Sequence, residues 1–497
     1  MASPFDFLRK LLASKASQAK MQSFESAKQS PSRTNVYTKA PSDFRKEFDS
    51  YTQREIIRKS RYLEKNSGIL REFVQSMAIY SVGHNGIRPQ ARTKDKSANA
   101  IYESIWADHA NSPSVCGRFT DWEVQIMLSK AIDRDGELFF VKTRDALGVA
   151  KIQIIEAHRI GNGTTKDEPG MVNGIKYGSR GEVIFYRVIQ DDGSFIDLAA
   201  NSVIHVYDKH QASGGRGYPT LQHSFAHLID QMEMLANEKK ATIDQSRISF
   251  HLEKSNGQAD EDDEQVFGDG GTNQGQMPKG ITYITEPGEK LNLIESNRPN
   301  SNFIPWMDFV ARDAIMGGLP WEFIADSSKV GAAGVKLSLA KASRLFKHRQ
   351  KMITTAYREI WFWVIGDAID QGDAPAVDGW WNPDWMLPKQ IALDVSREAY
   401  QNRLDIEFGL KSRTEDFAER QMDFEEQMQL RADEAVYLIN LAKEKNIPLE
   451  MLYKPSFNWL QPGMGGKPGE EGINPSSQPT EPMPPMDGEN SDLPQTD

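Results

Sequence analysis

The chain has 497 residues, 39% of them hydrophobic and 26% charged, which is typical of globular domains. Its formal net charge of −11 disfavours a static, sequence-reading DNA-binding protein, because such proteins usually carry a basic domain. The single cysteine, Cys116, excludes intrachain disulfides and zinc sites built on several cysteines, which is typical of a reducing compartment such as the cytoplasm. No apolar run approaches the about 20 residues of a membrane span, and the first residues lack a secretory-signal pattern.

The first half of the chain predicts helices followed by strands. Residues 1–50 are rich in Ser, Lys and Gln and predict a mobile arm. Arg54–Tyr80 places apolar residues at near-helical intervals, and two further helices are expected around Ile101–Trp106 and Asp121–Ile132. Short segments rich in β-branched and aromatic residues then predict strands over 137–143, 150–157, 182–189 and 202–208. The sequence "DDGS" (Asp191–Ser194) predicts a hairpin turn.

A long helix should follow "GGRGYPT" (Gly214–Thr220). Its apolar stripe fades after Ala236, so the second half should pack against a less apolar partner or against copies of itself. The acidic, glycine-rich insertion Gly257–Gly280 should be flexible. Two strands are expected across a Pro287–Gly288 turn, and a short helix is expected over 302–315.

The stretch "GLPWEFIADSSKVGAAG" (Gly318–Gly334) joins that short helix to the longest helical pattern, Val335–Ala368, which would span ~50 Å. One broad face of this helix is apolar, and basic residues fall within an arc of about 80° opposite. These basic residues are Lys336, Arg344, Lys347, Lys351 and Arg358. Two interpretations stay open, a solvated face of a core helix or a ridge that faces an anionic partner. A Trp- and Pro-rich connector leads to a last helical block, Ser396–Lys445.

Motifs for catalysis or cofactor binding are weak throughout. The stretch Gly318–Gly334 lacks the Gly-Lys-Ser/Thr of a phosphate-binding loop, and "GGRGYPT" lacks the third glycine of a dinucleotide fingerprint. His223 and His227 lie at i, i+4, but no acidic residue between them completes a zinc-protease motif. The carboxylates of "DRDGE" (Asp133–Glu137) are typical of a helix-to-strand turn. We therefore expect no enzyme activity, no cofactor and no metal, and favour a structural or assembly role.

Five stretches resemble one family, in the same order over residues 50–460. They are "RYLEKNSGILREFVQSMAIYSVGHNGIRPQ" (Arg61–Gln90), "RDGELFF" (Arg134–Phe140), "GRGYPTLQHSFAHLIDQMEMLANEKKATIDQSRIS" (Gly215–Ser249), "PGEKLNLIESNRPNSNFIPWMDFVARDAIMGGLPWEFIADSS" (Pro287–Ser328) and "REAYQNRLDIEFGLKSRTEDFAE" (Arg397–Glu419). With these stretches the chain resembles the portal proteins of tailed bacteriophages of the lambda type. It departs from the family in carrying "VGAAGVKLS" (Val330–Ser338) where an Asn-Tyr-Ser-Ser type stretch is usual.

The resemblance implies an α+β portal fold with long helices, a β-rich wing and a β-rich clip, assembling as a ring. It assigns residues 1–50 to a mobile N-terminal arm, 51–220 to the wing, 221–249 to the first stem helix, 250–300 to the clip, 301–316 to the second stem helix, 317–334 to the tunnel loop, 335–370 to the long wing helix, 371–460 to a connector and helical crown, and 461–497 to a disordered acidic tail.

The resemblance also implies a function. A ring of about twelve subunits would sit at one capsid vertex, and double-stranded DNA would be packaged and ejected through its channel. Implied partners are the terminase large subunit on the clip, the head-completion or head–tail connector proteins that replace it, and the major capsid and scaffold proteins at the rim. Implied locations are the virion and, during assembly, the host bacterial cytoplasm. The alternatives are a cytoplasmic enzyme or nucleotide-driven motor with an unrecognised site, and a monomeric peptide-binding scaffold.

Candidate residues for contact with DNA in such a channel come from three segments. Trp321 and Lys329 lie in the predicted tunnel loop, and Lys329 is the first candidate. Lys239, Lys240 and Arg247 lie on the first stem helix, where intersubunit salt bridges are the alternative. The remaining candidates lie on the basic face of the long helix: Lys336, Arg344, Lys347 and Lys351.

Overall fold

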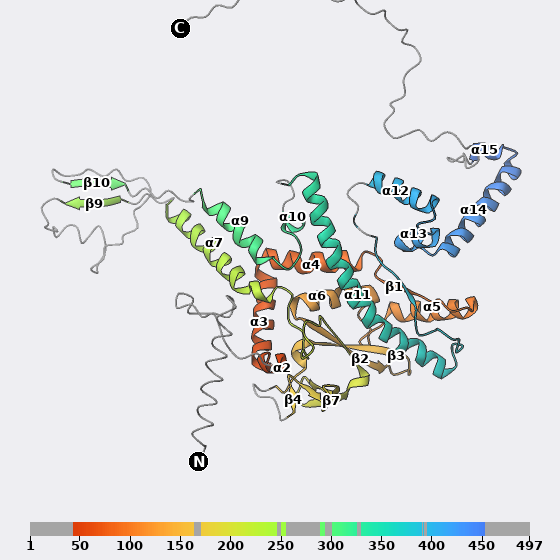
Figure 1. The fold of residues 1–497 in the computed structure, drawn as a ribbon, viewed down its shortest axis with the longest axis horizontal. Helices are drawn as coiled ribbons and strands as arrows, with labels where there is room; N and C mark the ends of the chain where they lie inside the picture. The colour runs from red at the N-terminus through yellow and green to blue at the C-terminus, as the bar shows by residue number, and fades with distance from the viewer. Residues whose placement is uncertain are drawn as a thin grey trace, which may run out of the picture. The chain divides into compact units, whose positions relative to one another are not determined.

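The computed structural model describes residues 43–163, 170–245, 250–254, 289–293, 301–325, 330–389, 391 and 395–452. The chain forms two compact units, residues 1–424 and 425–497. Helices and antiparallel sheets both contribute, so the predicted α+β class is confirmed (Figure 1). The predicted N-terminal arm up to residue 42, most of the clip, and the acidic tail lie outside the described residues.

The N-terminal helices are α2 (Phe44–Glu47), α3 (Ser50–Asn66), α4 (Gly68–Val82), α5 (Lys96–Asn111) and α6 (Asp121–Arg134). The helical pattern of Arg54–Tyr80 is thus two helices, separated at Ser67, whose backbone is extended (φ −104°, ψ 119°). Side chains start these helices as expected of N-caps. Asp49 accepts from Thr52 N, Asp95 accepts from Ser97 N, and Thr120 with Glu123 forms a capping box.

Two antiparallel sheets follow. One has the order β3-β2-β8, from β2 (Glu137–Arg144), β3 (Ala150–Glu156) and β8 (Val203–Tyr207). The other has the order β4-β5-β6-β7, from β4 (Met171–Val172), β5 (Ile175–Tyr177), β6 (Val183–Ile189) and β7 (Phe195–Ala199). All four predicted strands are confirmed, and the turn at Asp191–Ser194 closes β6 onto β7 through Gln190 N–H donating to Ser194 O at 2.8 Å.

Two small sheets pair distant segments. β1 (Arg88–Gln90) pairs with β11 (Asp384–Met386), and β9 (Phe250–Lys254) pairs with β10 (Glu289–Leu293). The strand expected before Pro287 lies outside the described residues, and β10 finds its partner at the other end of the insertion.

Four helices are described between residues 221 and 371, the region predicted to run from the first stem helix to the long wing helix: α7 (Phe225–Gln245), α9 (Phe303–Ala314), α10 (Trp321–Ile324) and α11 (Ala332–Gln371). A 3-10 turn over Gln222–Ser224 precedes α7, so the helix begins at Phe225 and not at Leu221. The last helices are α12 (Val395–Glu407), α13 (Arg413–Glu419), α14 (Phe424–Lys445) and α15 (Leu449–Leu452), which divide the predicted helical block. No described helix is both long enough and apolar enough to cross a membrane.

The buried apolar residues gather in three clusters, and α11 takes part in two of them. Its first half places Ala342 and Phe346 in a cluster with residues of α4 and α7. Its second half, from Ile353 to Ala368, packs with α5, α6 and the β3-β2-β8 sheet. The third cluster lies between the two larger sheets and includes Phe139 and Tyr186.

Candidate nucleic-acid interface

The turn "DRDGE" and the segment "GGRGYPT" cross in direct backbone contact. Gly136 has a φ of +91°, and a Cβ on it would lie 2.4 Å from the backbone of Tyr218. A Cβ on Gly217 would lie 2.1 Å from Gly136 O. Only glycine fits two backbones at these distances, so both glycines are needed to bring the segment that leads to α7 onto the start of the β2 strand.

Carboxylates of the same turn hold the crossing together. Glu137 is fully buried and accepts from Arg216 Nε at 2.7 Å, from Gly217 N at 2.9 Å and from Gln53 Nε2 at 2.8 Å. Burial raises the pKa of Glu137, but Arg216 and His205 outweigh burial and hold this pKa at about 2. A charged Glu137 therefore pairs with Arg216 inside the fold. The segment joins α6 to β2 as the sequence predicted, but its carboxylates also pair with buried arginines, which the prediction did not include.

Asp133, in the last turn of α6, pairs with a residue of α11. Arg349 makes a bidentate pair with it, with nitrogen–oxygen distances of 2.7 and 2.9 Å, and the Thr220 hydroxyl donates to it at 2.6 Å. Asp133 and Arg349 are both buried. This network joins α6, α11 and Thr220, which precedes the 3-10 turn that leads to α7. Sequence reasoning missed Arg349, although its spacing of four from Leu345 and from Ile353 places it on the apolar face of α11.

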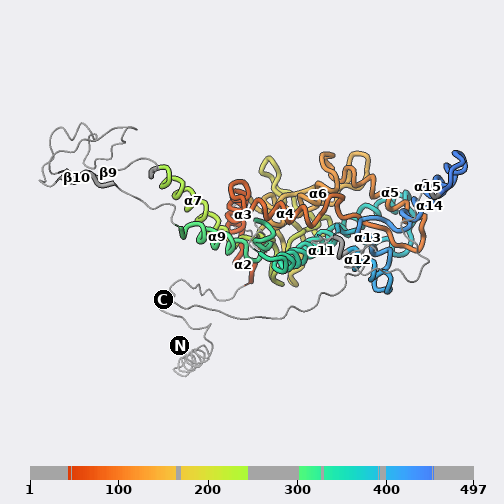
Figure 2. The backbone as a smooth tube through the Cα atoms, turned by 90° about the horizontal axis from the view of Figure 1, so that it is seen from above, coloured from red at the N-terminus to blue at the C-terminus, as the bar shows by residue number. Residues whose placement is uncertain are grey.

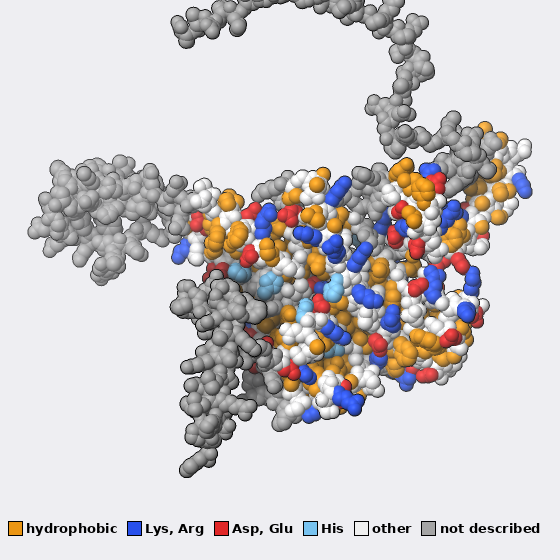
Figure 3. Space-filling model, viewed as in Figure 1, with side chains coloured by type: hydrophobic (Ala, Val, Ile, Leu, Met, Phe, Trp, Pro, Cys, Tyr) orange, Lys and Arg blue, Asp and Glu red, His pale blue; other side chains and the backbone are white. Residues whose placement is uncertain are grey.

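The basic face of α11 is exposed along its length. Lys336, Arg344, Lys347, Lys351 and Arg358 are all exposed, and none makes an ion pair with another described residue. Figure 3 shows blue side chains following α11 on this face of the molecule. We call these residues the basic ridge. Both interpretations of this face given from the sequence, a solvated face or a ridge toward an anionic partner, are compatible with this exposure.

The predicted tunnel loop is partly helical, because α10 lies within it. Trp321 and Phe323 of α10 are half-buried and pack on the cluster shared by α4, α7 and α11. Glu322 pairs with Arg312 of α9 at 3.1 Å. These contacts fix the first part of the loop, while Gly317 (φ +89°) supplies the left-handed turn that opens it. Lys329 lies outside the described residues.

The helices α7 and α9 lie against each other and extend away from α3, as both views show (Figures 1 and 2). Large apolar side chains on this pair are exposed to solvent: Leu235 and Ile243 on α7, and Ile304, Trp306 and Phe309 on α9. Three of these five side chains lie on α9, and the predicted packing of the second half of α7 against a less apolar partner or against copies of itself stays a prediction. Lys239 and Lys240 are exposed on α7, and Arg247 lies outside the described residues.

His223, in the 3-10 turn before α7, and His227 of α7 lie beside the C-terminal end of α9. His223 Nε2 lies 2.8 Å from Met316 O, and His227 Nε2 lies 3.9 Å from Asp313 Oδ2. Across the described part of the chain, no group of three or more His, Cys, Asp or Glu is placed to hold a metal ion. Both histidines thus make polar contacts with the segment at the end of α9.

The candidate residues fall into separate groups in space. The basic ridge lies on α11, Lys239 and Lys240 are neighbours on α7, and Trp321 of α10 is half-buried against the apolar cluster of α4, α7 and α11.

Comparison with known proteins supplies a family. The model of the family described as "Phage portal protein, lambda family" matches residues 32–350. No curated protein matches the chain. A chain in the virion of a native gene transfer agent particle is 13% identical, with a TM-score of 0.46 and coverage of 78% of this chain and 96% of that chain. A chain in the neck of an empty gene transfer agent particle is 12% identical, with a TM-score of 0.48 and the same coverage, 78% and 96%. An HK97 family phage portal protein from Corynebacterium diphtheriae is 14% identical, with a TM-score of 0.33 and coverage of 57% and 84%.

Proposed function

Because the chain belongs to the lambda family of phage portal proteins, we propose that it assembles into a ring of about twelve copies. The resemblance stated from the sequence is thereby confirmed, and the chain is a member of the portal protein family. In the proposed ring, double-stranded DNA passes through the central channel during packaging and ejection. The ring sits at one capsid vertex and is assembled in the cytoplasm of the host bacterium.

The exposed apolar surface of the α7–α9 pair is the observation that best supports the proposed ring. Ile304, Trp306 and Phe309 are 71%, 51% and 61% exposed, which is unusual for large side chains gathered on one short helix. A lateral contact between neighbouring copies would cover them. Repetition of one such contact closes a ring when the rotation between copies fits.

The charges of the described residues suit a channel through which DNA slides. Each phosphate neutralised by Lys or Arg adds affinity that does not depend on sequence, so a strongly basic channel would hold DNA in place. The acidic chain with a few placed cations favours passage instead. We propose that Trp321, Lys329, Lys239, Lys240 and Arg247 contribute to the channel wall, together with Lys336, Arg344, Lys347 and Lys351 of the basic ridge.

The other partners follow from the parts of the family fold. Residues 250–300 would form the clip on which the terminase large subunit docks during packaging. Head-completion or head–tail connector proteins would take its place afterwards. The major capsid protein and the scaffold protein would contact the wing and rim. The crown, within residues 371–460, would face the capsid interior.

Negative-stain images and native mass spectrometry of the purified full-length chain test this function. Rings with a central hole, with a mass of about twelve subunits, are expected. A monodisperse monomer that hydrolyses ATP would refute the portal assignment and support a nucleotide-driven enzyme.

A further inference from the structure

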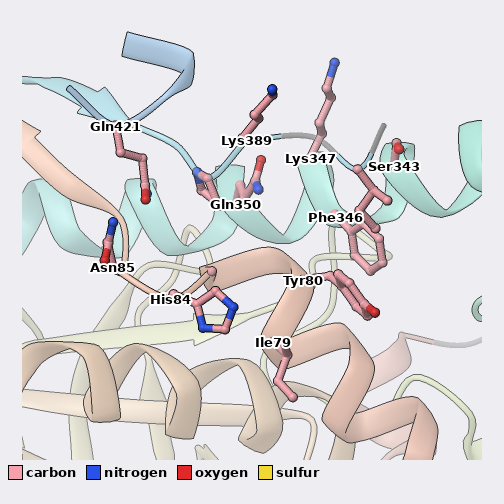
Figure 4. A pocket seen from close by; sticks show the side chains of 13 residues that line it. Ile79, Tyr80, His84, Asn85, Ser343, Phe346, Lys347, Gln350, Lys389 and Gln421 are labelled. Atoms are coloured by element: carbon pink, nitrogen blue, oxygen red, sulfur yellow. The ribbon is translucent and has the colours of Figure 1, made fainter. Parts of the chain in front are cut away.

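A cavity of about 340 Å³ opens between the end of α4, the first half of α11 and the segment around Pro388 (Figure 4). Its apolar wall is formed by Tyr80 of α4 and Phe346 of α11, whose rings stack with centroids 5.5 Å apart. Phe346 is buried, while Tyr80 is 43% exposed. The cavity therefore offers an aromatic surface to a ligand of moderate size.

The polar residues that line the cavity are cationic or neutral. Lys347 and Lys389 are exposed, make no ion pair with another described residue, and point to the same side of the cavity in Figure 4. His84 lies on the opposite side. None of the described residues that line the cavity is Asp or Glu. An anionic group at the two lysines would therefore meet attraction without repulsion.

Two amide side chains add hydrogen-bond acceptors to these cations. Gln350 Nε2 donates to Ser81 O at 3.2 Å, and Gln421 Nε2 donates to Gly86 O at 2.8 Å. Their Oε1 atoms accept no hydrogen bond from the described residues, so they are free to accept from N–H or O–H donors of a ligand. The exocyclic amino group of a base brings such donors, whereas a lone carboxylate brings none at neutral pH.

We propose that this cavity binds a nucleotide unit, either free or in an unpaired stretch of DNA. The base packs against Tyr80 with its amino edge toward Gln350 and Gln421, and the phosphate lies at Lys347 and Lys389. Lys347 also belongs to the basic ridge, so a strand that follows α11 reaches the cavity directly. The proposal goes beyond the channel function, because stacking of one base on an aromatic side chain does not require a closed ring.

Binding of dAMP to the full-length protein, measured by calorimetry, is the first test, with inorganic phosphate at equal ionic strength as comparison. The Lys347→Gln/Lys389→Gln variant should bind dAMP about 10-fold more weakly, and its affinity for a labelled single-stranded oligonucleotide should lose about one unit of salt slope per lysine. A matched variant, Lys59→Gln/Lys94→Gln, removes two exposed lysines elsewhere and should bind as the unmodified chain does.

The Tyr80→Leu variant tests the base. It keeps an apolar side chain but removes the ring, and it should weaken dAMP and the single strand about 10-fold while leaving a 20-base-pair duplex unaffected. Unchanged dAMP binding in both the lysine and the tyrosine variants would overturn the proposal. Displacement of the oligonucleotide by polyglutamate as readily as by dAMP would also overturn it, in favour of an acidic peptide. Ring images of each variant separate the two proposals, because an empty cavity leaves rings intact whereas failure of the portal function means that no rings form.

Discussion

Replacing Arg349 with methionine should destabilise the fold through the charge that it leaves behind. Asp133 is fully buried, and after the change the Thr220 hydroxyl is the one side-chain partner that it keeps among the described residues. Removal of one member of a buried ion pair costs about 3–5 kcal/mol, because the other charge stays in a medium of low dielectric. The Arg349 guanidinium also donates to Ser129 O at 2.6 Å, so the expected loss lies toward the upper end of that range.

A double-mutant cycle separates the charge from the packing. Asp133→Leu combined with Arg349→Met removes both charges, and replacement of a buried pair by apolar residues is often close to neutral. We therefore expect the double variant to regain at least about 2 kcal/mol relative to Arg349→Met alone. The free energy of unfolding can be followed by urea denaturation with intrinsic tryptophan fluorescence. A double variant as unstable as the single one would refute the reasoning, since the loss would then come from packing alone.

Four further predictions concern other parts of the chain. Gly136→Ala should cost more than about 2 kcal/mol of unfolding free energy, whereas Gly148→Ala, which also has a positive φ but open space around it, should cost less in the same urea assay. Burial and Lys151 lower the pKa of His109 to about 4. As pH falls, the unfolded chain therefore binds the extra proton first, and ~3 kcal/mol of unfolding free energy should be lost between pH 6.5 and 4. His109→Leu should flatten this pH dependence of stability, and an unchanged slope would contradict the assignment to His109. Phe309→Asp should prevent ring formation in negative-stain images without changing the circular dichroism of the chain, and intact rings would argue against the proposed lateral contact. Lys329→Glu should leave rings normal but reduce DNA packaging or retention, with Lys329→Arg as the conservative control, and unchanged packaging in the glutamate variant would remove Lys329 from the channel.

Periodicity predicted most elements of the first unit. The strands around Phe140, Ile155, Tyr186 and Val206 were found because alternation and β-branched residues mark half-buried strands directly. The break at Ser67 was missed, because the apolar spacing continues across it. Gly68 alone was too weak a signal for a helix end, and no proline stands nearby. Such a break is decided by how two helices pack, which a single-sequence pattern does not carry.

The contacts of the buried charges could not be predicted in the same way. Asp133, Glu137, Arg216 and Arg349 are ordinary surface residues by type, and their partners lie 79 residues apart for Arg216 and Glu137 and 216 apart for Arg349 and Asp133. Only the folded chain brings them together. The basic ridge, by contrast, depends on one helix alone, and its exposure follows from helical geometry. The assignment of the ridge, the stem lysines and Lys329 to DNA stays a prediction.

The length of α11 has a mechanical consequence. Its 40 residues run without a break from the end of the loop that contains α10 to the Trp-rich segment, a distance of about 60 Å. Because residues of α11 belong to both large apolar clusters, a rotation of one cluster would also move the other. A tilt of about 5° at one end would move the other by roughly 5 Å. A displacement of the loop at one end of α11 would therefore be transmitted along the helix to its other end, without local unfolding between them.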